Sequence, residues 1–523
     1  MKMNRIFAVG MLTALAMLAF PGGLDQVFAQ ESKAPEKGAV KKSVETLQVP
    51  SLNWEKRSDW LNVKDAGAVG DGAADDTAAI QAMLDRLSDS NDMLKNARCR
   101  NIYFPPGRYR ITKTLEIRNS TGAYLVGHGR ETVLFWDGEQ AGNLIWSNGS
   151  HYARYEGFVL DGKNKASIAV LHHSMTYYET SLRYQHCEFR NFTEGGVVVG
   201  KGAGKGLAES KNQSAEIWFN NCIFRNCGAG ASFLQFNDYD NFFDGCHFED
   251  CGIGVNSTRG NFAVRNCSFE RSKEVDVRQA SPSHACAVRW STSRGSKKFF
   301  DTGIGMHQSF TAQDCRVDGW TGKDGAFSLG HRGPSTIFDC VFTNPPDNLP
   351  PVRLINRENT EAQLIVSNNI SKATKYVVAP GLNSKITEIP DGKLSSCLKD
   401  AKQVFFRTTA KIPGKVFDAV KDFNARGNGS VDDSDAIQNC INAAKAHGKG
   451  AIAYLPGGSY KITKTILVDG SDYYIGSTGF CSYLKWASPT EGVMMAVADP
   501  QNVTIEHLSL YQAPKTVVQI RQT

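Results

Sequence analysis

The sequence lacks a block of basic residues, a second long apolar run and a cysteine spacing typical of a metal site. Beyond the first 29 residues, no stretch approaches the roughly 20 apolar residues that a membrane-spanning helix needs. The formal net charge is only +6, and no compact Lys/Arg block beyond the N-terminal linker is present to follow a phosphate backbone. No Cys-x-x-Cys pair or His/Cys zinc spacing occurs. We therefore expect no membrane span in the mature chain, no nucleic-acid partner and no metal-ligand motif.

Proline is also scarce, with 18 residues against 49 glycines and no Gly-X-Y period. This balance indicates many tight turns and few long helices. Hydrophobic residues make up 41% of the chain, which is ample for a core. The composition therefore excludes both a disordered chain and a small disulfide scaffold.

The N-terminus is typical of a secretory signal peptide. Lys2 and Arg5 precede a largely apolar stretch over 6–20, and small residues suited to cleavage follow it. We expect residues 1–29 to be removed and the mature protein to be secreted or periplasmic. Residues 30–61 then form a linker.

A short Cys-x-Phe element recurs through the middle of the chain. Positions three before and two after each cysteine are apolar, and the residue directly before it is His, Asn, Gly or Asp, types that tolerate a left-handed backbone. A bend there turns all three apolar positions toward one core. The spacing predicts stacked parallel coils about 4.8 Å apart, roughly nine in number, in a right-handed parallel β-helix. The cysteines are Cys187, Cys222, Cys246, Cys267 and Cys340, with Cys315 in a variant that has valine two positions later.

Thirteen cysteines in an exported chain raise the question of disulfides. Cysteines in one column of stacked coils point the same way, so we favour an inward ladder of reduced thiols. Cys227 and Cys251 form a second such column. A network of disulfides is the alternative.

A longer module occurs twice and sets the domain organisation. Each copy opens with a glycine-rich bend, an Asp-Asp pair and a helix with one apolar face, which we expect to cover the open end of a β-helix. Asp75-Asp76 is either an acid/base site or a helix cap, and the cap is favoured. The predicted fold is all-β with short capping helices: a first parallel β-helix domain over 62–395, a linker over 396–415, and the start of an incomplete second module over 416–523. The matching segments are 63–72 with 420–429, 75–81 with 432–438, and 103–114 with 454–465.

The bend, the Asp-Asp-Thr helix and the Tyr-Phe-Pro-Pro-Gly-x-Tyr strand together resemble the pectate-lyase superfamily of rhamnogalacturonase and epimerase type. The resemblance covers 63–126 well and 420–475 slightly less well. It implies a right-handed parallel β-helix that handles long polysaccharides, and the tandem modules resemble paired β-helix exo-β-1,3-glucanases. The family contains lyases, hydrolases, epimerases and tail-spike modules, so the reaction does not follow from it.

The chain departs from two branches of that family. It lacks the Asn-Thr-Asp and Arg-Ile-Lys motifs of polygalacturonase-type hydrolases, and its lone Gly127-His128-Gly129 fits a structural turn. It also lacks the acidic cluster of calcium-dependent pectate lyases. The sequence requires no cofactor, and Ca²⁺ stays an option if the protein is a lyase.

Three carboxylates are candidates for glycoside hydrolysis. Asp238 and Asp240 are two positions apart in a strand-like run, so we expect both on one face with Cα atoms about 6.6 Å apart. Hydrolysis usually needs two carboxyl groups about 5–5.5 Å apart for retention or about 6.5–9.5 Å apart for inversion. Glu216, one coil earlier, is the next candidate. A solvated polar face is the alternative reading of these residues.

A lyase would instead need a base and cationic groups that stabilise an enolate-like intermediate. His331 and Arg332, in a loop flanked by glycines, are the candidate catalytic residues for that chemistry. Polar residues in the same rows of the stack are candidates for substrate binding: Glu179, Arg259 and His307.

Trp290 and Trp320 are either sugar-stacking platforms or loop anchors. Together these features predict an exported carbohydrate-active enzyme that cleaves a polysaccharide by hydrolysis or β-elimination. The alternative is a noncatalytic glycan-binding or structural β-helix.

Overall fold

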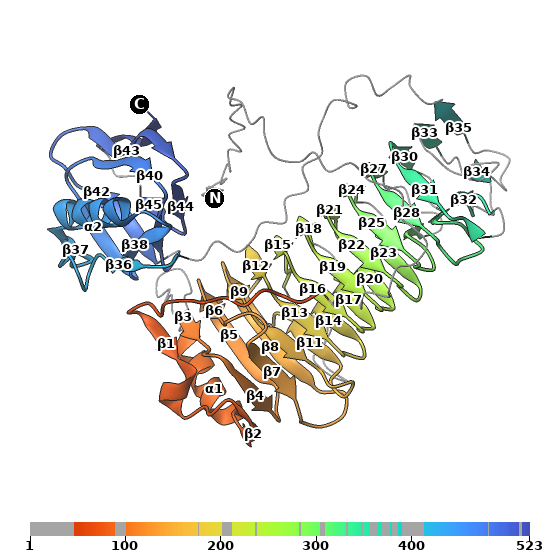
Figure 1. Ribbon diagram of the computed structural model, residues 1–523, viewed down its shortest axis with the longest axis horizontal. Coiled ribbons are helices and arrows are strands. Elements are labelled where there is room, and N and C mark those ends of the chain that lie inside the picture. The colour runs from red at the N-terminus through yellow and green to blue at the C-terminus, as the bar shows by residue number, and fades with distance from the viewer. Residues whose placement is uncertain are drawn as a thin grey trace, which may run out of the picture. The chain divides into compact units, whose positions relative to one another are not determined.

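The computed structural model describes residues 47–88, 101–175, 177–200, 212–235, 238–281, 284–303, 309–330, 333–346, 349–355, 363–367, 377–378, 385–389, 413–479, 481–511 and 515–522. Within them, Gln48–Thr523 form one compact unit. Its regular structure consists mainly of short parallel strands in stacked coils (Figure 1).

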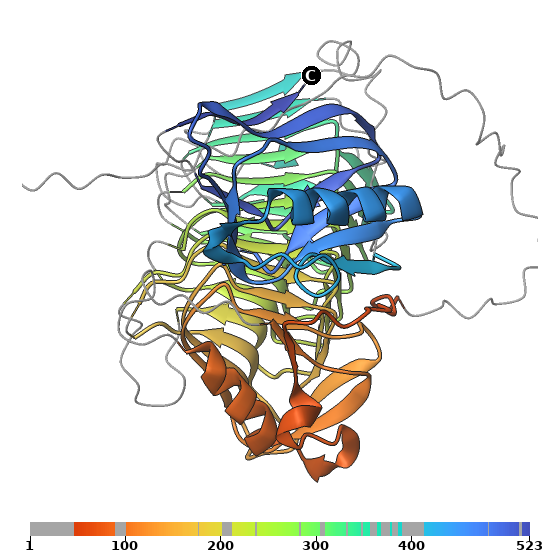
Figure 2. The ribbon, with the colours of Figure 1, turned by 90° about the vertical axis from the view of Figure 1, so that its left-hand side faces the viewer.

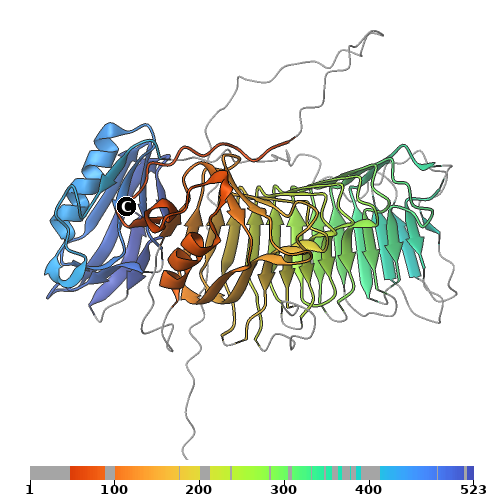
Figure 3. The same cartoon turned by 90° about the horizontal axis from the view of Figure 1, so that it is seen from below.

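The first β-helix has three parallel sheets, and each coil contributes one strand to each sheet. Figure 3 shows the strands of successive coils side by side. The fold is the expected right-handed parallel β-helix. Its longest described sheet has 13 strands, more than the roughly nine coils inferred from the cysteine spacing, because the coils before Cys187 and after Cys340 carry no Cys-x-Phe element.

Sheet 1 contains, in spatial order, β1 (Trp60–Asn62), β3 (Asn101–Tyr103), β6 (Tyr124–Val126), β9 (Arg154–Glu156), β12 (Leu182–Gln185), β15 (Ile217–Asn220), β18 (Asn241–Asp244), β21 (Phe262–Arg265), β24 (Cys286–Arg289), β27 (Phe310–Gln313), β30 (Pro334–Phe338), β33 (Gln363–Ser367) and β35 (Lys385–Ile389). Sheet 2 contains β2 (Asp71–Asp75), β4 (Gly107–Ile111), β7 (Thr132–Trp136), β10 (Val159–Asp161), β13 (Glu188–Arg190), β16 (Ile223–Arg225), β19 (His247–Glu249), β22 (Ser268–Glu270), β25 (Thr292–Arg294), β28 (Arg316–Asp318) and β31 (Val341–Thr343). Sheet 3 contains β5 (Leu115–Thr121), β8 (Asn143–His151), β11 (Ile168–His172), β14 (Gly195–Val199), β17 (Ala229–Phe233), β20 (Ile253–Ser257), β23 (Val275–Gln279), β26 (Phe300–Thr302), β29 (Phe327–Leu329), β32 (Val352–Leu354) and β34 (Val377–Val378).

Left-handed residues make the corners of the coils. The predicted bend before each cysteine is confirmed, because the residue there has a positive φ in all six coils: His186, Asn221, Gly245, Asn266, Asp314 and Asp339. Two further corners also have positive φ values, and in the coil of Cys246 they fall at Asp240 and Asp250, with φ of 56° and 54°. The corner at Asp240 determines which side chains reach the surface of sheet 1.

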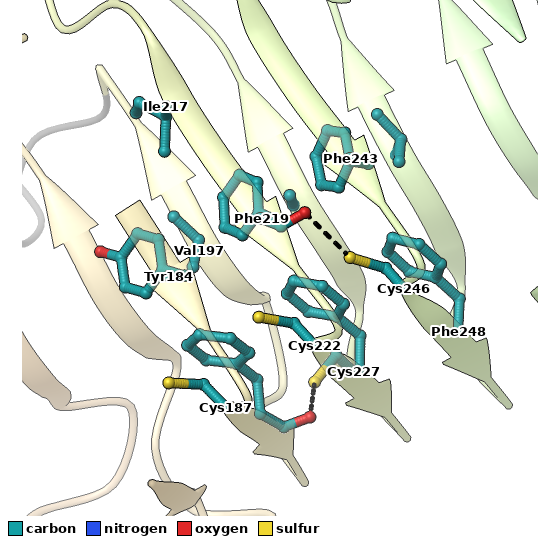
Figure 4. Close-up of a cluster of buried hydrophobic side chains, with 14 of the residues drawn as sticks. Tyr184, Cys187, Val197, Ile217, Phe219, Cys222, Cys227, Phe243, Cys246 and Phe248 are labelled. Carbon is teal, nitrogen blue, oxygen red and sulfur yellow. Dashed lines mark hydrogen bonds between the residues drawn. The ribbon is translucent and has the colours of Figure 1, made fainter. Parts of the chain in front are cut away.

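The core is a set of ladders running through successive coils (Figure 4). Tyr184, Phe219 and Phe243 stack with centroids 5.1 and 4.6 Å apart, and a second ladder of phenylalanines runs beside them. The predicted column of reduced thiols is confirmed for the described residues in this ladder, whose cysteines are buried and free. Buried Ser291 takes the cysteine position midway between Cys267 and Cys315, which explains the doubled interval. In the second module, Cys481 forms a disulfide bond.

The second module repeats the opening of the first. Its sheets are β36 (Val416–Asp418), β38 (Ala451–Leu455), β41 (Tyr473–Ser477) and β44 (Thr504–Glu506); β37 (Asn428–Asp432), β39 (Gly458–Ile462), β42 (Ser482–Trp486) and β45 (Ser509–Tyr511); and β40 (Ile466–Ser471), β43 (Gly492–Gln501) and β46 (Thr516–Gln522). Helix α2 (Ser434–His447) packs against β38 and β40 (Figure 2), as α1 (Thr77–Leu84) packs against β5 in the first module. Both helices bury the expected apolar face.

The Asp-Asp pairs act structurally, but only one member of each pair caps the helix. Asp75 accepts a hydrogen bond from the Thr77 N–H at 3.1 Å. Asp76 is buried and instead accepts the N–H groups of Val69 and Gly70 in the glycine-rich bend. The second module repeats both sets of bonds through Asp432 and Asp433. The expectation that Asp76 caps the helix is wrong, because its carboxylate accepts hydrogen bonds from backbone N–H groups of the glycine-rich bend instead.

Candidate functional site

The outer face of sheet 1 carries a hollow with a volume of about 290 Å³. Three residues that point outward from adjacent strands, Ala263, Ala287 and Thr311, form its floor, and they lie in register across β21, β24 and β27. Because these side chains are small, they leave open the space that large rings occupy at the same position on the preceding strands. Its remaining lining consists of Asp240, Asn241, Phe242, Asn261, Phe262, Ala285, Cys286 and Ser309.

Two aromatic rings continue the same outward row on β15 and β18. Trp218 and Phe242 are 42% and 39% exposed, and their ring centroids lie 5.2 Å apart. The guanidinium carbon of Arg183 lies 5.5 Å from the centre of the Trp218 ring. Adjacent exposed rings beside a hollow with both polar and apolar lining residues are typical of a ligand-binding surface rather than of an ordinary protein exterior.

Asp240 forms part of the wall of this hollow. Its positive φ places it at a corner of the coil, and its side chain is exposed. The Asp240 N–H donates to Asn261 Oδ1 at 2.6 Å, and Asn261 Nδ2 donates to Asp240 Oδ1 at 3.0 Å. This paired contact between neighbouring coils fixes the carboxylate at the rim of the hollow.

Asp238 does not share that surface, so the expectation that both carboxylates face one groove is wrong. The corner at Asp240 interrupts the strand, and Asp238 is fully buried. Asp238 Oδ2 accepts the Gln235 N–H at 2.9 Å, and burial raises the pKa of the carboxyl well above its usual value. A buried carboxyl held by the backbone cannot contact a polymer on the surface.

Glu216 occupies the corner equivalent to Asp240 in the preceding coil. Its φ is 57°, and its exposed carboxylate accepts hydrogen bonds from Thr180 and Ser181 at 2.7 and 2.6 Å. Corners of adjacent coils lie about 4.8 Å apart along the backbone. Each carboxylate also precedes an exposed ring by two residues, Trp218 or Phe242. The structure therefore pairs Asp240 with Glu216 rather than with Asp238.

Glu179 is buried inside a polar corner and does not line the surface, contrary to the expectation for its row. Its carboxylate contacts Ser147 at 2.5 Å, Ser214 at 2.8 Å and His172 Nδ1 at 3.0 Å. His172 Nε2 in turn lies 2.6 Å from the hydroxyl of Tyr184. These bonds satisfy the buried carboxylate and tie together the ends of several strands.

The remaining candidates fall into four groups. Trp320 is buried in the core beside Phe342, so it is an internal anchor and not a sugar platform. Trp290 is half-buried at a corner and donates to Asp314 Oδ2 at 3.2 Å. Arg259 is exposed. His307, His331 and Arg332 lie outside the described residues.

Other possible sites carry less weight. A second hollow, of about 10 Å³, lies among Phe104, Leu134, Phe158 and other core side chains, and it is too small for a ligand. Within the part of the chain that the structure describes, no group of three or more His, Cys, Asp or Glu side chains is arranged to hold a metal ion. None of the described helices is both long and apolar enough to cross a membrane.

Comparison with known proteins is consistent with this geometry. The family described as rhamnogalacturonase A/epimerase, pectate lyase-like matches residues 60–278 and 417–518. The chain belongs to this family. Its matched segments include both opening modules and the coils that build the rings and carboxylates of sheet 1.

Curated relatives match the chain only over short segments. A probable glucan endo-1,3-beta-glucosidase of Arthroderma benhamiae is 35% identical over 94 residues, which is 16% of this chain and 11% of the relative. The mannuronan C5-epimerase AlgE3 of Azotobacter vinelandii is 40% identical over 80 residues, which is 14% of this chain and 4% of the relative. A solved family 28 exopolygalacturonase of Yersinia enterocolitica has a TM-score of 0.41 at 12% identity, covering 64% of this chain and 78% of that one.

Proposed function

We propose that this protein is exported, binds a polysaccharide along the outer face of sheet 1 and cleaves its glycosidic bonds by hydrolysis. The observation that carries the proposal is the hollow of about 290 Å³ beside the exposed rings of Trp218 and Phe242, with Asp240 in its wall. An open face built from stacked strands suits an extended polymer, because each coil offers an equivalent position to a successive sugar. The names of two relatives, a probable glucan endo-1,3-beta-glucosidase and a mannuronan C5-epimerase, support a polysaccharide as the substrate.

Asp240 and Glu216 are the proposed catalytic pair. One carboxylic acid protonates the glycosidic oxygen, and the other carboxylate activates water or attacks the anomeric carbon. Their backbone spacing of about 4.8 Å is close to the carboxyl separation of retaining enzymes. Their hydrogen bonds run in opposite directions along the stack, toward Ser181 and toward Asn261, which increases the carboxyl separation toward the inverting range. The anomeric configuration of the first product distinguishes the two outcomes.

The test is product analysis by mass spectrometry and ultraviolet absorbance, with neutral and uronate polysaccharides, with and without Ca²⁺. Saturated products with new reducing ends support the proposal. Unsaturated products would overturn hydrolysis in favour of β-elimination and direct attention to His331 and Arg332. Asp244→Asn is the matched control for substitutions of Asp240 and Glu216, because Asp244 lies at the end of β18 and pairs with Arg265 at 2.8 Å on the protein surface.

A noncatalytic glycan-binding protein is the second candidate. One observation favours it: among the described residues, Asp240 is the one carboxylate that lines the hollow itself. Under this alternative, the protein slows in affinity gels that contain a polysaccharide and releases no product from it. If Trp218→Ala loses that retention and the wild type releases no products, the protein binds the polysaccharide and does not cleave it.

A further inference from the structure

One layer inside the first β-helix departs from the apolar ladders around it. The strand register aligns Gly196, Gly230 and Gly254 on successive coils, and the next coil has Asp276 at that position. Asp276 lies on β23 and is fully buried. The repeat has therefore replaced a glycine by a carboxylate inside the core.

A backbone carbonyl and a phenylalanine ring of the following coil together leave no room for a Cβ atom at these glycines. A Cβ atom on Gly196, Gly230 or Gly254 would lie 2.7–2.9 Å from a phenyl ring of the following coil. In the coil that follows Asp276, the register replaces that phenylalanine by Ser293. The smaller Ser293 side chain removes the ring that would otherwise lie against the Asp276 side chain.

Two more exchanges surround the same space with hydroxyl groups. The second thiol column, Cys227 and Cys251, continues as Ser272 and Ser296, and both serines are buried. Hydroxyls of Ser272, Ser293 and Ser296 face the Asp276 carboxylate. Where the other coils have a glycine, a phenylalanine and two cysteines, this part of the stack thus has one carboxylate and three hydroxyls.

The three hydroxyls lie near enough to lower the pKa of the Asp276 carboxyl, but none of them makes a hydrogen bond of normal geometry to it. Neither Asp276 oxygen has a hydrogen-bond partner among the described residues, and neither has the Ser272 hydroxyl. No charged side chain acts on Asp276 there; burial and the three hydroxyls are the influences on it. An ionised carboxylate in an apolar interior is costly unless an opposite charge accompanies it.

We propose that Asp276, Ser272, Ser293 and Ser296 form a buried binding site for a single sodium ion. Carboxylate and hydroxyl oxygens are hard donors, which suit hard cations rather than transition metals. One carboxylate balances the charge of a monovalent ion, whereas a divalent ion would leave an excess positive charge in the core. The site lies inside the stack, so its role is to stabilise the fold.

Sodium bound by the folded state alone raises the thermal midpoint by mass action. The test compares the wild-type protein in NaCl and in choline chloride at equal ionic strength and equal scan rate. At pH 8 we expect the midpoint to be about 2 °C or more higher in NaCl.

Variants assign the effect to the site. Asp276→Asn should lose the sodium response, and Asp276→Gly, which restores the residue of the neighbouring coils, serves if the first variant does not fold. Asp244→Asn removes a carboxylate from the surface of the same β-helix and should keep the response. Equal midpoints of the wild type in both salts at pH 8 would overturn the proposal, as would a sodium response that survives in both Asp276 variants. The measurement needs no polysaccharide, so it stands apart from the proposed function.

Discussion

Trp218 and Phe242 lie on consecutive strands of one sheet with their ring centroids 5.2 Å apart, and both rings face outward beside the hollow. Rings that belonged to the core would be buried, as the residues on either side of each ring in its strand are. The exposure of two neighbouring rings marks a surface that contacts something other than the protein itself.

Truncation of either ring should weaken polysaccharide binding. We expect Trp218→Ala and Phe242→Ala each to reduce affinity about tenfold, because each removes a contact worth about 1–1.5 kcal/mol. Affinity electrophoresis or calorimetry with the preferred polysaccharide measures the change. Tyr178→Ala is the control, because Tyr178 is equally exposed but packs on His151 away from the hollow. Equal losses in the control would mean that the rings have no special role.

Catalysis should depend on the corner carboxylates and not on the buried one. Asp240→Asn and Glu216→Gln each remove a proton donor or acceptor, so we expect kcat to fall at least about 100-fold. Asp238→Asn should keep most activity, because burial already favours the neutral form of that side chain. Steady-state kinetics of the three variants on one substrate gives the answer. Inactive Asp238→Asn with active Asp240→Asn would reverse the assignment.

The repeat pattern predicted the fold because its signals are local. A residue type that tolerates positive φ directly before each cysteine, with apolar residues three before and two after, leaves few alternatives to a stacked coil. The corner at Asp240 is harder to predict, since the equivalent positions hold Ser181 and Glu216, which have no strong preference for a left-handed backbone. A period-two argument across that corner therefore placed Asp238 on the wrong side of the chain.

The candidate site was predicted only in part. Asp240 and Glu216 belong to a polar row that the alignment on cysteines reveals. Trp218 and Phe242 carry a signal as well, an aromatic residue between two inward-facing positions, but aromatic residues are so common in this core that the signal does not stand out. The proposed sodium site depends on which side chains meet across coils, and the strand register is needed to bring Asp276 and Ser293 together.

The phenylalanine ladder should behave as a continuous core. Phe248 is buried between Phe224 and Phe269, with ring centroids 4.8 and 4.7 Å away. Phe248→Ala should lower the free energy of unfolding by about 3–5 kcal/mol, because it leaves a cavity that rigid neighbouring coils cannot fill. Phe248→Leu should cost less, since it retains most of the volume. Urea denaturation followed by circular dichroism compares them, and similar losses in both variants would contradict a cavity as the cause.

Asp276 should make the stability of the β-helix depend on pH in the absence of sodium. Burial raises the pKa of its carboxyl from 3.8 to about 7, so between these values the folded state holds a proton that the unfolded state has released. Unfolding in this range therefore releases a proton, and stability falls as the pH rises from about 4 to about 7. Below about pH 4 both states are protonated and the penalty is absent; above about pH 7 it is complete, at about 4 kcal/mol as an upper value. Urea denaturation in choline chloride at pH 4 and pH 8 measures the loss, and the difference between wild type and Asp276→Asn isolates it from other titrating groups. A difference between the two proteins that stays constant over this range would show that the Asp276 carboxyl has an ordinary pKa in the folded state.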